Sequence, residues 1–362
     1  MKQCDEDEFW QVVMESEDPS RTSLLRLADS QDPELGSSVD VDDDCSAEEF
    51  QPEFRFITYR IPWRNSNLNA CSANVDDLHL KLSPLPDSDG VWSPLGAQAW
   101  YASALLVAYV LQSTVRQNPQ DTDTETVLSR SIKSWFADAN NQNASFRALE
   151  LGSGAVGLAG IVMGFVLADH ATLKPPLVIL TDNETNVLQN LKHNVNRAEK
   201  LWQAEAIKKH KANHRPPAQT PSFPEFSVQN LEWNSNLSSE LYQGDHKLQL
   251  IFGSELVYTG ETAEACAKIV LDLLQANPDA LVFILQVTDR DGWTNVFLPM
   301  LRQKHHLQMI EESIDDSDLH ELAETIVPAG GTLDRFAFGG CYVFQSAGRI
   351  PTLFGDDSHG IT

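Results

Sequence analysis

Three glycines in the middle of the chain have a spacing that suits the binding of a nucleoside cofactor. Gly152, Gly154 and Gly157 follow a predicted buried strand, 147–151, and lead directly into an apolar run, 158–167. Glycines in this pattern let a strand turn sharply into a helix and let the backbone approach a ligand closely. The free N–H groups at the start of that helix then face whatever lies over the turn. The pattern therefore predicts a strand, a glycine turn and a buried helix around a cofactor.

Two acidic residues make this motif more specific. Asp182 ends a second predicted strand, 177–181, and lies 25 residues beyond Gly157, where an acid binds the two ribose hydroxyls. Glu150 precedes the glycines, where it either offsets the positive charge of a sulfonium ligand or only hydrogen-bonds the turn. Nicotinamide dinucleotides and S-adenosylmethionine both use this plan. Glu150 favours S-adenosylmethionine, and the chain lacks the Tyr-x-x-x-Lys motif of many nicotinamide enzymes.

The elements that must hold these residues alternate along the chain. From residue 147 onward, strand-length apolar runs alternate with helix-length runs, an order that produces parallel strands joined by crossover helices. The predicted strands cover 147–151, 177–181, 226–233, 248–253, 281–285, 307–310 and 336–344, the last as a hairpin or a bulged strand. The predicted helices cover 158–167, 184–195, 262–276 and 296–301. The expected fold is therefore α/β and Rossmann-like.

The segment before this region has a different pattern. Residues 54–61 and 78–82 are rich in β-branched, aromatic or alternating apolar residues, which predicts a small N-terminal β element. Residues 100–111 lack a helix breaker and are mostly apolar, which predicts a buried helix. Trp100 at its start is either a core aromatic or one wall of the cofactor cleft. An amphipathic helix is predicted over 127–136.

Charge is concentrated in particular segments. The formal net charge is −26, and residues 1–50 hold 16 Asp and Glu against 3 Lys and Arg. Such a segment buries too little apolar surface to fold alone, so we predict a disordered acidic tail. Residues 199–224 join a basic cluster to four prolines, which predicts an inserted loop. Residues 346–362 are predicted to be a frayed C-terminal tail.

The composition also argues against several classes of function. An acidic chain is poorly suited to bind nucleic acid through a broad basic face. No apolar run reaches 18 residues and the N-terminus is acidic, so neither a transmembrane helix nor a signal peptide is predicted. The five scattered cysteines contain no C-x-x-C pair, which argues against a disulfide framework and a zinc site. We expect a soluble, intracellular protein without a metal.

Five short motifs occur in a fixed order: Trp100 with its helix, Glu150-Leu-Gly-Ser-Gly154, Thr181-Asp182, Leu231-Glu-Trp233 and Glu255-Leu-Val-Tyr258. Together they resemble the seven-strand, non-SET protein methyltransferases, in the lysine methyltransferase-like branch called methyltransferase family 16. The resemblance implies a seven-strand methyltransferase sheet with helices on both faces, and S-adenosyl-L-methionine as the cofactor. It covers roughly residues 54–345, so we expect one methyltransferase domain over 51–345, preceded within it by the β element at 51–95.

The resemblance also implies a role for each matching position. The implied cofactor-binding residues are Trp100, Glu150, Gly152, Ser153, Gly154, Asp182, Glu232, Trp233 and Ser254. The implied catalytic residues are Glu255, which would attract and orient a lysine ammonium, and Tyr258, which would hold it by cation–π contact. No metal is implied. The alternatives are that Trp100 and Trp233 only pack and that Glu255 is a helix N-cap.

The acceptor stays open at this point. Many lysine-modifying relatives have Asp where this chain has Glu255, and a histidine-modifying relative has Glu there, so histidine and small-molecule acceptors are alternatives. A binding or scaffold protein that keeps the fold without activity is another. The resemblance implies a protein substrate such as a translation factor or chaperone, rather than a membrane or a nucleic acid. We expect a monomer in the cytoplasm, with the nucleus as a further candidate compartment.

Overall fold

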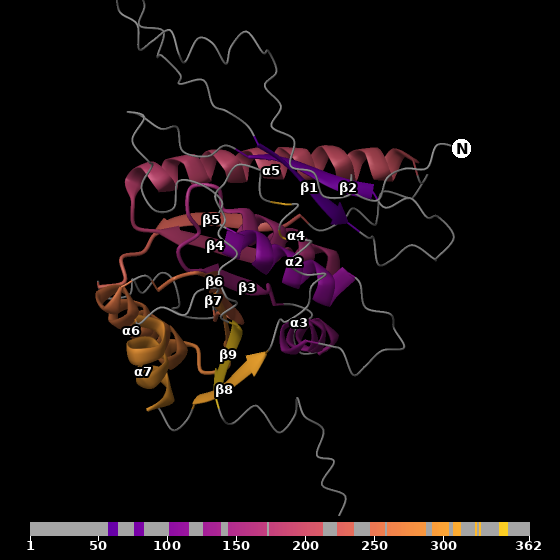
Figure 1. Cartoon of the computed structure of the whole chain (residues 1–362). Coiled ribbons are helices and arrows are strands. Elements are labelled where there is room, and N and C mark those ends of the chain that lie inside the picture. The colour runs from indigo at the N-terminus through magenta and orange to yellow at the C-terminus, as the bar shows by residue number, and fades with distance from the viewer. Residues whose placement is uncertain are drawn as a thin grey trace, which may run out of the picture.

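A computed structural model of the chain places a central sheet between two groups of helices (Figure 1). It describes residues 57–63, 76–82, 101–115, 126–138, 144–171, 174–212, 223–234, 247–257, 259–286, 292–303, 307–312 and 340–346, together with Ala323 and Ile326. The predicted acidic tail, 1–50, lies outside the described residues, and so does the predicted C-terminal tail beyond Ser346.

The central sheet has seven strands in the order β5-β4-β3-β6-β7-β9-β8. The first five strands in this order are parallel, and β9 runs antiparallel to both β7 and β8. The strands are β3 (Arg147–Glu150), β4 (Leu177–Asp182), β5 (Glu225–Asn230), β6 (Leu250–Ser254), β7 (Leu281–Gln286), β8 (Leu307–Glu312) and β9 (Gly340–Ser346). This confirms the predicted Rossmann-like, seven-strand sheet. The C-terminal segment contributes a single strand, β9, between β7 and β8.

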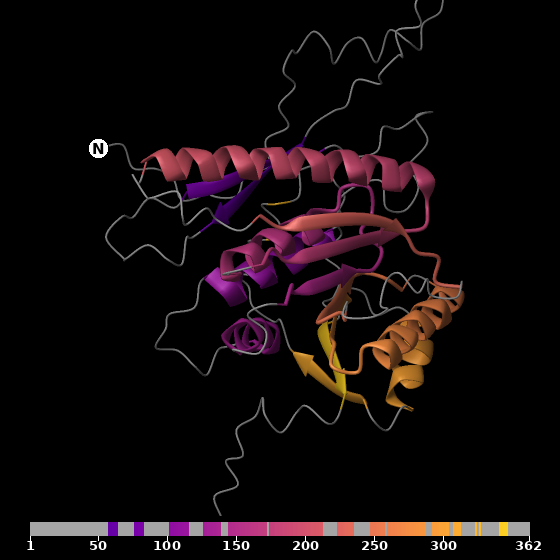
Figure 2. The same ribbon diagram turned by 180° about the vertical axis from the view of Figure 1, so that it is seen from behind.

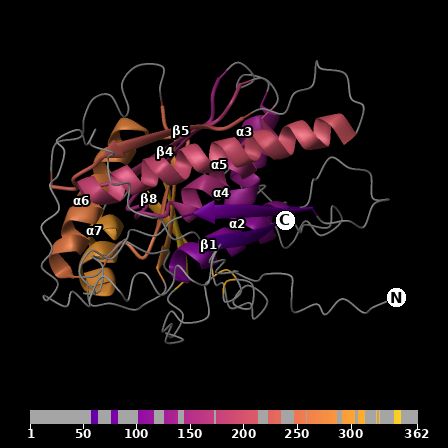
Figure 3. The same ribbon diagram turned by 90° about the horizontal axis from the view of Figure 1, so that it is seen from above.

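Alternate residues of the four parallel strands β3, β4, β6 and β7 face two different hydrophobic cores, because successive side chains of a strand point to opposite faces. In β6, Leu250 and Phe252 belong to one core and Ile251 to the other. Two helices of the first core are α2 (Tyr101–Val115) and α4 (Leu158–His170), whereas α6 (Gly260–Ala276), η6 (Trp293–Phe297) and α7 (Leu298–Arg302) belong to the second. Figure 3 shows α6 and α7 on the opposite side of the strands from α2 and α4. Helices therefore cover both faces of the sheet, as predicted.

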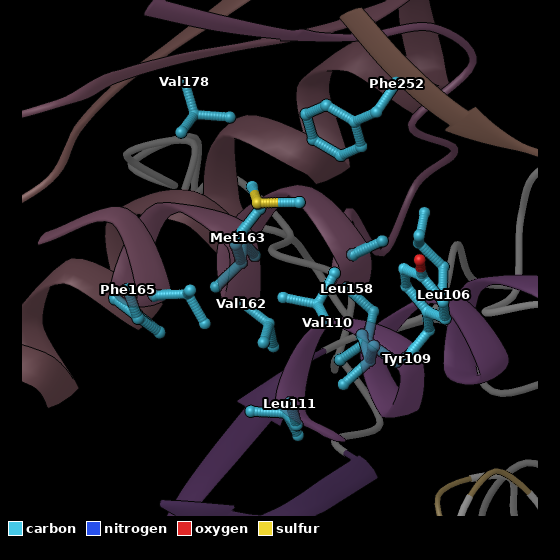
Figure 4. Close-up of a cluster of buried hydrophobic side chains, with 14 of the residues drawn as sticks. Leu106, Tyr109, Val110, Leu111, Leu158, Val162, Met163, Phe165, Val178 and Phe252 are labelled. Carbon is cyan, nitrogen blue, oxygen red and sulfur yellow. The ribbon is translucent and has the colours of Figure 1, made fainter. Parts of the chain in front are cut away.

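The first core is built mainly from α2 and α4, which pack together against the sheet (Figure 4). Leu106 and Val110 of α2 lie close to Leu158 and Val162 of α4, and all four are at most 2% exposed. Burying such side chains contributes about 1.5–3 kcal/mol each. The same core includes residues of α3 (Val127–Ala137), whose N-cap Thr126 accepts a bond from Ser129 N. The packing fixes the N-terminal end of α4, where the glycine turn ends at Gly157.

The N-terminal β element is present as an antiparallel hairpin of β1 (Ile57–Trp63) and β2 (Asp76–Leu82). Its inward residues Tyr59, Ile61, Leu80 and Leu82 are at most 1% exposed and join the first core. The hairpin lies beside the long helix α5 in both side views (Figures 1 and 2). It is therefore an integral part of the fold, as the alternating pattern of residues 78–82 predicts.

The prediction of an inserted loop over 199–224 is wrong for its first half. Helix α5 runs from Thr185 to Ala212, so residues 199–212 are helical, while 213–222 lie outside the described residues. This stretch is rich in Lys, Ala, Glu and Gln, which favour helix, and contains neither Gly nor Pro. Trp202 also anchors it by stacking on Phe165 of α4, with the ring centroids 4.4 Å apart.

No helix among the described residues is both long and apolar enough to cross a membrane.

Candidate functional site

A cavity of about 490 Å³ lies at the carboxyl ends of the parallel strands. The chain passes from β3 outward to β4 and β5, and later from β6 outward to β7, so the connections after β3 and β6 diverge. Such a switch point is where open α/β sheets bind ligands. The cavity is lined by Ser103, Gly152, Ser153, Gly154, Val156, Gly157, Leu158, Asp182, Asn183, Glu184, Leu231, Glu232, Trp233, Asn234, Ser254, Glu255, Leu256, Glu261, Thr262 and Ala265.

The glycine loop after β3 forms one side of this cavity. Gly152, Gly154 and Gly157 have φ values of 62°, 64° and 66°, a left-handed backbone that residues with a Cβ rarely adopt. Backbone hydrogen bonds fix the loop to the neighbouring strand β4, because Ser153 N donates to Thr181 O at 2.8 Å. In return, Thr181 N donates to Ser153 Oγ at 3.1 Å. The conformation of the loop thus depends on its three glycines and on its hydrogen bonds to Thr181 at the end of β4.

Asp182, at the tip of β4, connects the loop to the start of α5. Its Oδ2 accepts a bond from Gly154 N at 3.1 Å, and its Oδ1 accepts one from Asn183 N at 2.8 Å. Burial raises the pKa of this carboxyl group, and the bonds from backbone N–H groups partly oppose that rise. Asp182 lines the cavity, so the structure places a partly buried, oriented carboxylate where the sequence predicts the ribose-binding acid.

Glu150 lies behind the loop and does not line the cavity. It is 3% exposed, and burial raises its pKa to about 7. The Ser153 side chain and the Gly160 backbone beside its carboxyl group lower that pKa, and the charge of Asp182 adds to the rise. A Cβ at Gly160 would clash with this carboxyl group. Of the two alternatives for Glu150, this geometry favours support of the turn over direct contact with a ligand.

The segment after β5 forms a second side. Trp233 is half-buried and lines the cavity, and its ring lies 3.7 Å from the point that a Cβ at Gly152 would occupy. Glu232 is exposed at the edge of the cavity. Leu231 N donates to Asp182 O at 2.9 Å, which fixes this segment to the tip of β4. An indole is therefore placed across from the glycine loop, as the Leu-x-Trp motif predicts.

The segment after β6 forms the third side. Ser254 ends β6, and its hydroxyl lies 3.2 Å from the hydroxyl of Ser103 on α2. Glu255 follows with a φ of 50° and 5% exposure, and its N–H donates to Leu285 O at 2.8 Å. A non-glycine residue in this conformation costs roughly 1–3 kcal/mol and is a feature of functional sites. The alternative of Glu255 as a helix N-cap is wrong, because Thr259 caps α6.

The structure brings together most of the residues that the sequence singled out. Eight of them line the one cavity: Gly152, Ser153, Gly154, Asp182, Glu232, Trp233, Ser254 and Glu255. Trp100 and Tyr258 lie outside the described residues. The cavity also includes residues that the sequence motifs do not predict: Ser103 of α2, and Glu261 and Thr262 in the first turn of α6. Of these, Ser103 has a signal in the sequence, because it is a polar residue among the apolar residues of its helix.

The cavity suits S-adenosylmethionine in size and charge. Its volume lies within the range of about 300–1,000 Å³ typical of small-molecule sites. Its titratable lining residues are carboxylates, which complement a cationic sulfonium and ammonium, and Asp182 presents two acceptor oxygens beside the glycine loop. Within the described ranges, no three His, Cys, Asp or Glu side chains are grouped as metal ligands are.

A model of the lysine methyltransferase family matches residues 87–215 and 218–304, more than half of the chain. The chain belongs to this family. It is accordingly an S-adenosylmethionine-dependent methyltransferase. The matched region includes the glycine loop, Asp182, Trp233 and Glu255, and it begins after the β1–β2 hairpin. No curated protein matched the methyltransferase in sequence.

Solved structures with related folds include three methyltransferases. A human methyltransferase 10 domain-containing protein is 12% identical over 68% of this chain and 97% of that chain, with a TM-score of 0.34. A Podospora anserina methyltransferase bound to S-adenosylhomocysteine is 10% identical over 67% of this chain and 87% of that chain, with a TM-score of 0.32. An O-methyltransferase from Bacillus cereus is 12% identical over 67% of this chain and 90% of that chain, with a TM-score of 0.32.

Proposed function

We propose that this methyltransferase transfers a methyl group to a lysine side chain of a protein substrate. The observation that carries the proposal is the charge of the cavity. Its described lining contains no lysine, arginine or histidine, and its titratable side chains are all acidic: Asp182, Glu184, Glu232, Glu255 and Glu261. Such a lining attracts a cationic side chain and repels the phosphates of a nucleic acid. The description of the family as lysine methyltransferases supports the same acceptor.

Glu255 is the residue best placed to receive the lysine. Its carboxylate is 5% exposed, so its field is weakly screened by water and strongly attracts an ammonium group within the cavity. Bound S-adenosylmethionine supplies the electrophilic methyl group. The lysine nitrogen attacks only in its neutral form, so its proton must leave to water first. In this proposal Glu255 orients the ammonium before that loss, and it is not required to accept the proton itself.

The test is transfer of tritium-labelled methyl groups from S-adenosylmethionine to fractionated cellular protein, with the labelled residue identified by mass spectrometry. We expect methyllysine. In the Glu255→Gln variant, transfer should fall by at least ~10-fold, the size of a lost charge-assisted contact, while calorimetric affinity for S-adenosylhomocysteine stays within about twofold. Glu264→Gln, an exposed residue of α6 outside the cavity, is the matched control. Equal losses of transfer and of cofactor binding would instead place Glu255 against the cofactor.

Histidine is the second candidate acceptor, because Glu255 stands where a histidine-modifying relative also has Glu. The pH dependence of transfer separates the two. A lysine amine has an ordinary pKa of about 10.4, so its neutral fraction and the transfer rate should keep rising between pH 7 and 9. A histidine ring, with an ordinary pKa of about 6.5, is already neutral over that range. A flat profile together with methylhistidine in the product would overturn the lysine proposal.

A further inference from the structure

The segment that carries Glu255 is attached to the fold by residues far from it in the sequence. Residues 254–259, which we call the acceptor wall, connect β6 to α6, and Tyr258 within it lies outside the described residues. The first attachment is a backbone bond: Glu255 N donates to Leu285 O, near the end of β7, at 2.8 Å. This bond holds the residue in its left-handed conformation.

The second attachment comes from the next residue of β7. Gln286 is fully buried, and its Nε2 donates to Val257 O at 3.4 Å. A fully buried glutamine at the end of a strand costs free energy unless its polar atoms form hydrogen bonds. Here the amide reaches the acceptor wall two residues beyond Glu255.

The third attachment is a close approach at Gly292, the residue before η6. A Cβ at Gly292 would lie 2.6 Å from Thr259 O, 2.9 Å from the Thr259 carbonyl carbon and 3.1 Å from Val257 Cγ1. The φ of Gly292 is −63°, which any residue adopts, so its backbone conformation does not require glycine. The requirement is spacing: the backbone of Gly292 lies directly against the backbone of Thr259, the N-cap of α6.

Gly292 belongs to a firmly packed unit. The π-helix η6 stacks Trp293 on Phe297 with ring centroids 4.5 Å apart, and both side chains are at most 2% exposed. Both rings lie in the second core with residues of α6. A π-helical turn of this kind is frequent beside functional sites. A methyl group at Gly292 therefore cannot be accommodated without a shift of the acceptor wall relative to η6.

We propose that Gln286 and Gly292 are positioning residues, which set the placement of the acceptor wall, and with it the Glu255 carboxylate, relative to the cofactor. The glycine loop is fixed to β4, whereas Leu285, Gln286 and Gly292 hold alternate residues of the acceptor wall: 255, 257 and 259. A small error in the relative placement of two reacting groups lowers a transfer rate strongly. The inference rests on the proposed cationic acceptor, because it concerns where the acceptor carboxylate points.

The experiment compares two cofactor analogues and needs no protein substrate. S-adenosylhomocysteine fills the cofactor site alone, whereas sinefungin carries an additional amine, protonated at neutral pH, where the methyl group is transferred. In the wild-type protein, calorimetry should give ~10-fold tighter binding of sinefungin, the value of a bond to a charged group. In Gly292→Ala this preference should fall to about twofold or less, while affinity for S-adenosylhomocysteine stays within about twofold.

Gly260→Ala is the matched control. It is the same substitution, next to Thr259 in the chain, and a Cβ there meets nothing within 4 Å, so it should retain the sinefungin preference. Gln286→Met keeps the volume of the side chain and removes the bond to Val257. It serves as the second variant if Gly292→Ala does not fold, and thermal unfolding checks the fold of each protein.

Three outcomes distinguish the possible errors. Failure of the wild-type protein to bind S-adenosylhomocysteine would overturn the cofactor site and everything that depends on it. Binding without a sinefungin preference would contradict the cationic acceptor site and the positioning inference together. A wild-type preference that persists unchanged in Gly292→Ala and in Gln286→Met would leave the proposed function standing and overturn the positioning inference alone.

Discussion

Two of the three sides of the cavity, those formed by the segments after β3 and after β6, are held in place by different contacts. The cofactor wall, which comprises Gly152–Gly154 and Asp182, is held by bonds between the glycine loop and the adjacent strand β4. The acceptor wall, residues 254–259, is held mainly by β7 and by the residue before η6, through contacts between residues 29 to 33 apart along the chain. The bonds that hold the glycine loop also join residues 28 apart along the chain, so the two walls do not differ in sequence separation. They differ because the cofactor wall has a recognisable sequence pattern, glycine spacing and an acid at a strand tip, whereas the contacts that hold the acceptor wall follow no such pattern.

The backbone conformations show the same contrast. The cofactor wall reaches its left-handed turns with glycines, which adopt them without steric cost. In the acceptor wall, Glu255 is the non-glycine residue with a positive φ among the described residues, and it costs roughly 1–3 kcal/mol. Glycine or asparagine would fit this backbone with less strain. The strained conformation at Glu255 therefore supports the proposal that its carboxylate orients the acceptor.

The largest expected effect is on the cofactor wall. Asp182→Ala removes the proposed ribose acceptor and also the bond from Gly154 N to Oδ2 at 3.1 Å. The variant loses the carboxylate bonds to the ribose and the carboxylate bond to Gly154 N. Together these losses should weaken S-adenosylhomocysteine binding by roughly 100-fold in calorimetry. Asp279→Ala, an exposed residue outside the cavity, should retain wild-type affinity. Unchanged affinity in the Asp182 variant would show that the loop alone carries cofactor binding.

A smaller effect is expected from Glu150, which supports the cofactor wall from behind. Burial raises its pKa from the ordinary 4.5 to about 7, so the folded protein retains a proton that the unfolded chain releases across this window. The stability that depends on this group is present below pH 4.5 and is lost as the pH rises through 7. Glutamine does not ionise, so Glu150→Gln should gain stability relative to wild type by ~1 kcal/mol or more between pH 4.5 and 7.5.

Urea unfolding of both proteins at the two pH values measures this difference. Glu264→Gln, on the exposed surface of α6, is the control for the removal of a carboxylate. A stability difference between Glu150→Gln and wild type that does not change with pH would mean that the carboxyl group of Glu150 does not titrate in this window. In that case Glu150 would support the loop only through its contacts with Ser153 and Gly160.

The same contrast explains what the sequence predicts well. The order of elements and the cofactor wall depend on local patterns, namely apolar strand runs, glycine spacing and an acid at a strand tip, and the sequence alone predicts each of them. Ser103 and Gly292 became visible only in the fold, because their importance lies in contacts with Ser254 and Thr259. The basic cluster and prolines after residue 207 indicate a loop over 199–224, but residues 199–212 are helical because they have high helix propensity and Trp202 stacks on Phe165.

The smallest expected effect compares two helix caps. Thr259 caps α6 at the acceptor wall through a capping box with Thr262, and Thr126 caps α3 by accepting a bond from Ser129 N at 3.2 Å, away from the cavity. Changing either threonine to alanine should lower the free energy of unfolding by ~1 kcal/mol. Thr259→Ala should in addition slow methyl transfer by about threefold, because Thr262 and the acceptor wall lose a fixed position.

Thr126→Ala should leave the transfer rate per folded molecule at the wild-type value. Chemical denaturation gives the folded fraction of each variant, and the transfer rate measured at about 15 to 25 °C is divided by that fraction. If both variants slow transfer equally, the loss follows global stability and the acceptor wall has no special dependence on its cap. If only Thr259→Ala slows it, the wall depends on local order at the start of α6, which is the property that Gly292 and Gln286 are proposed to protect.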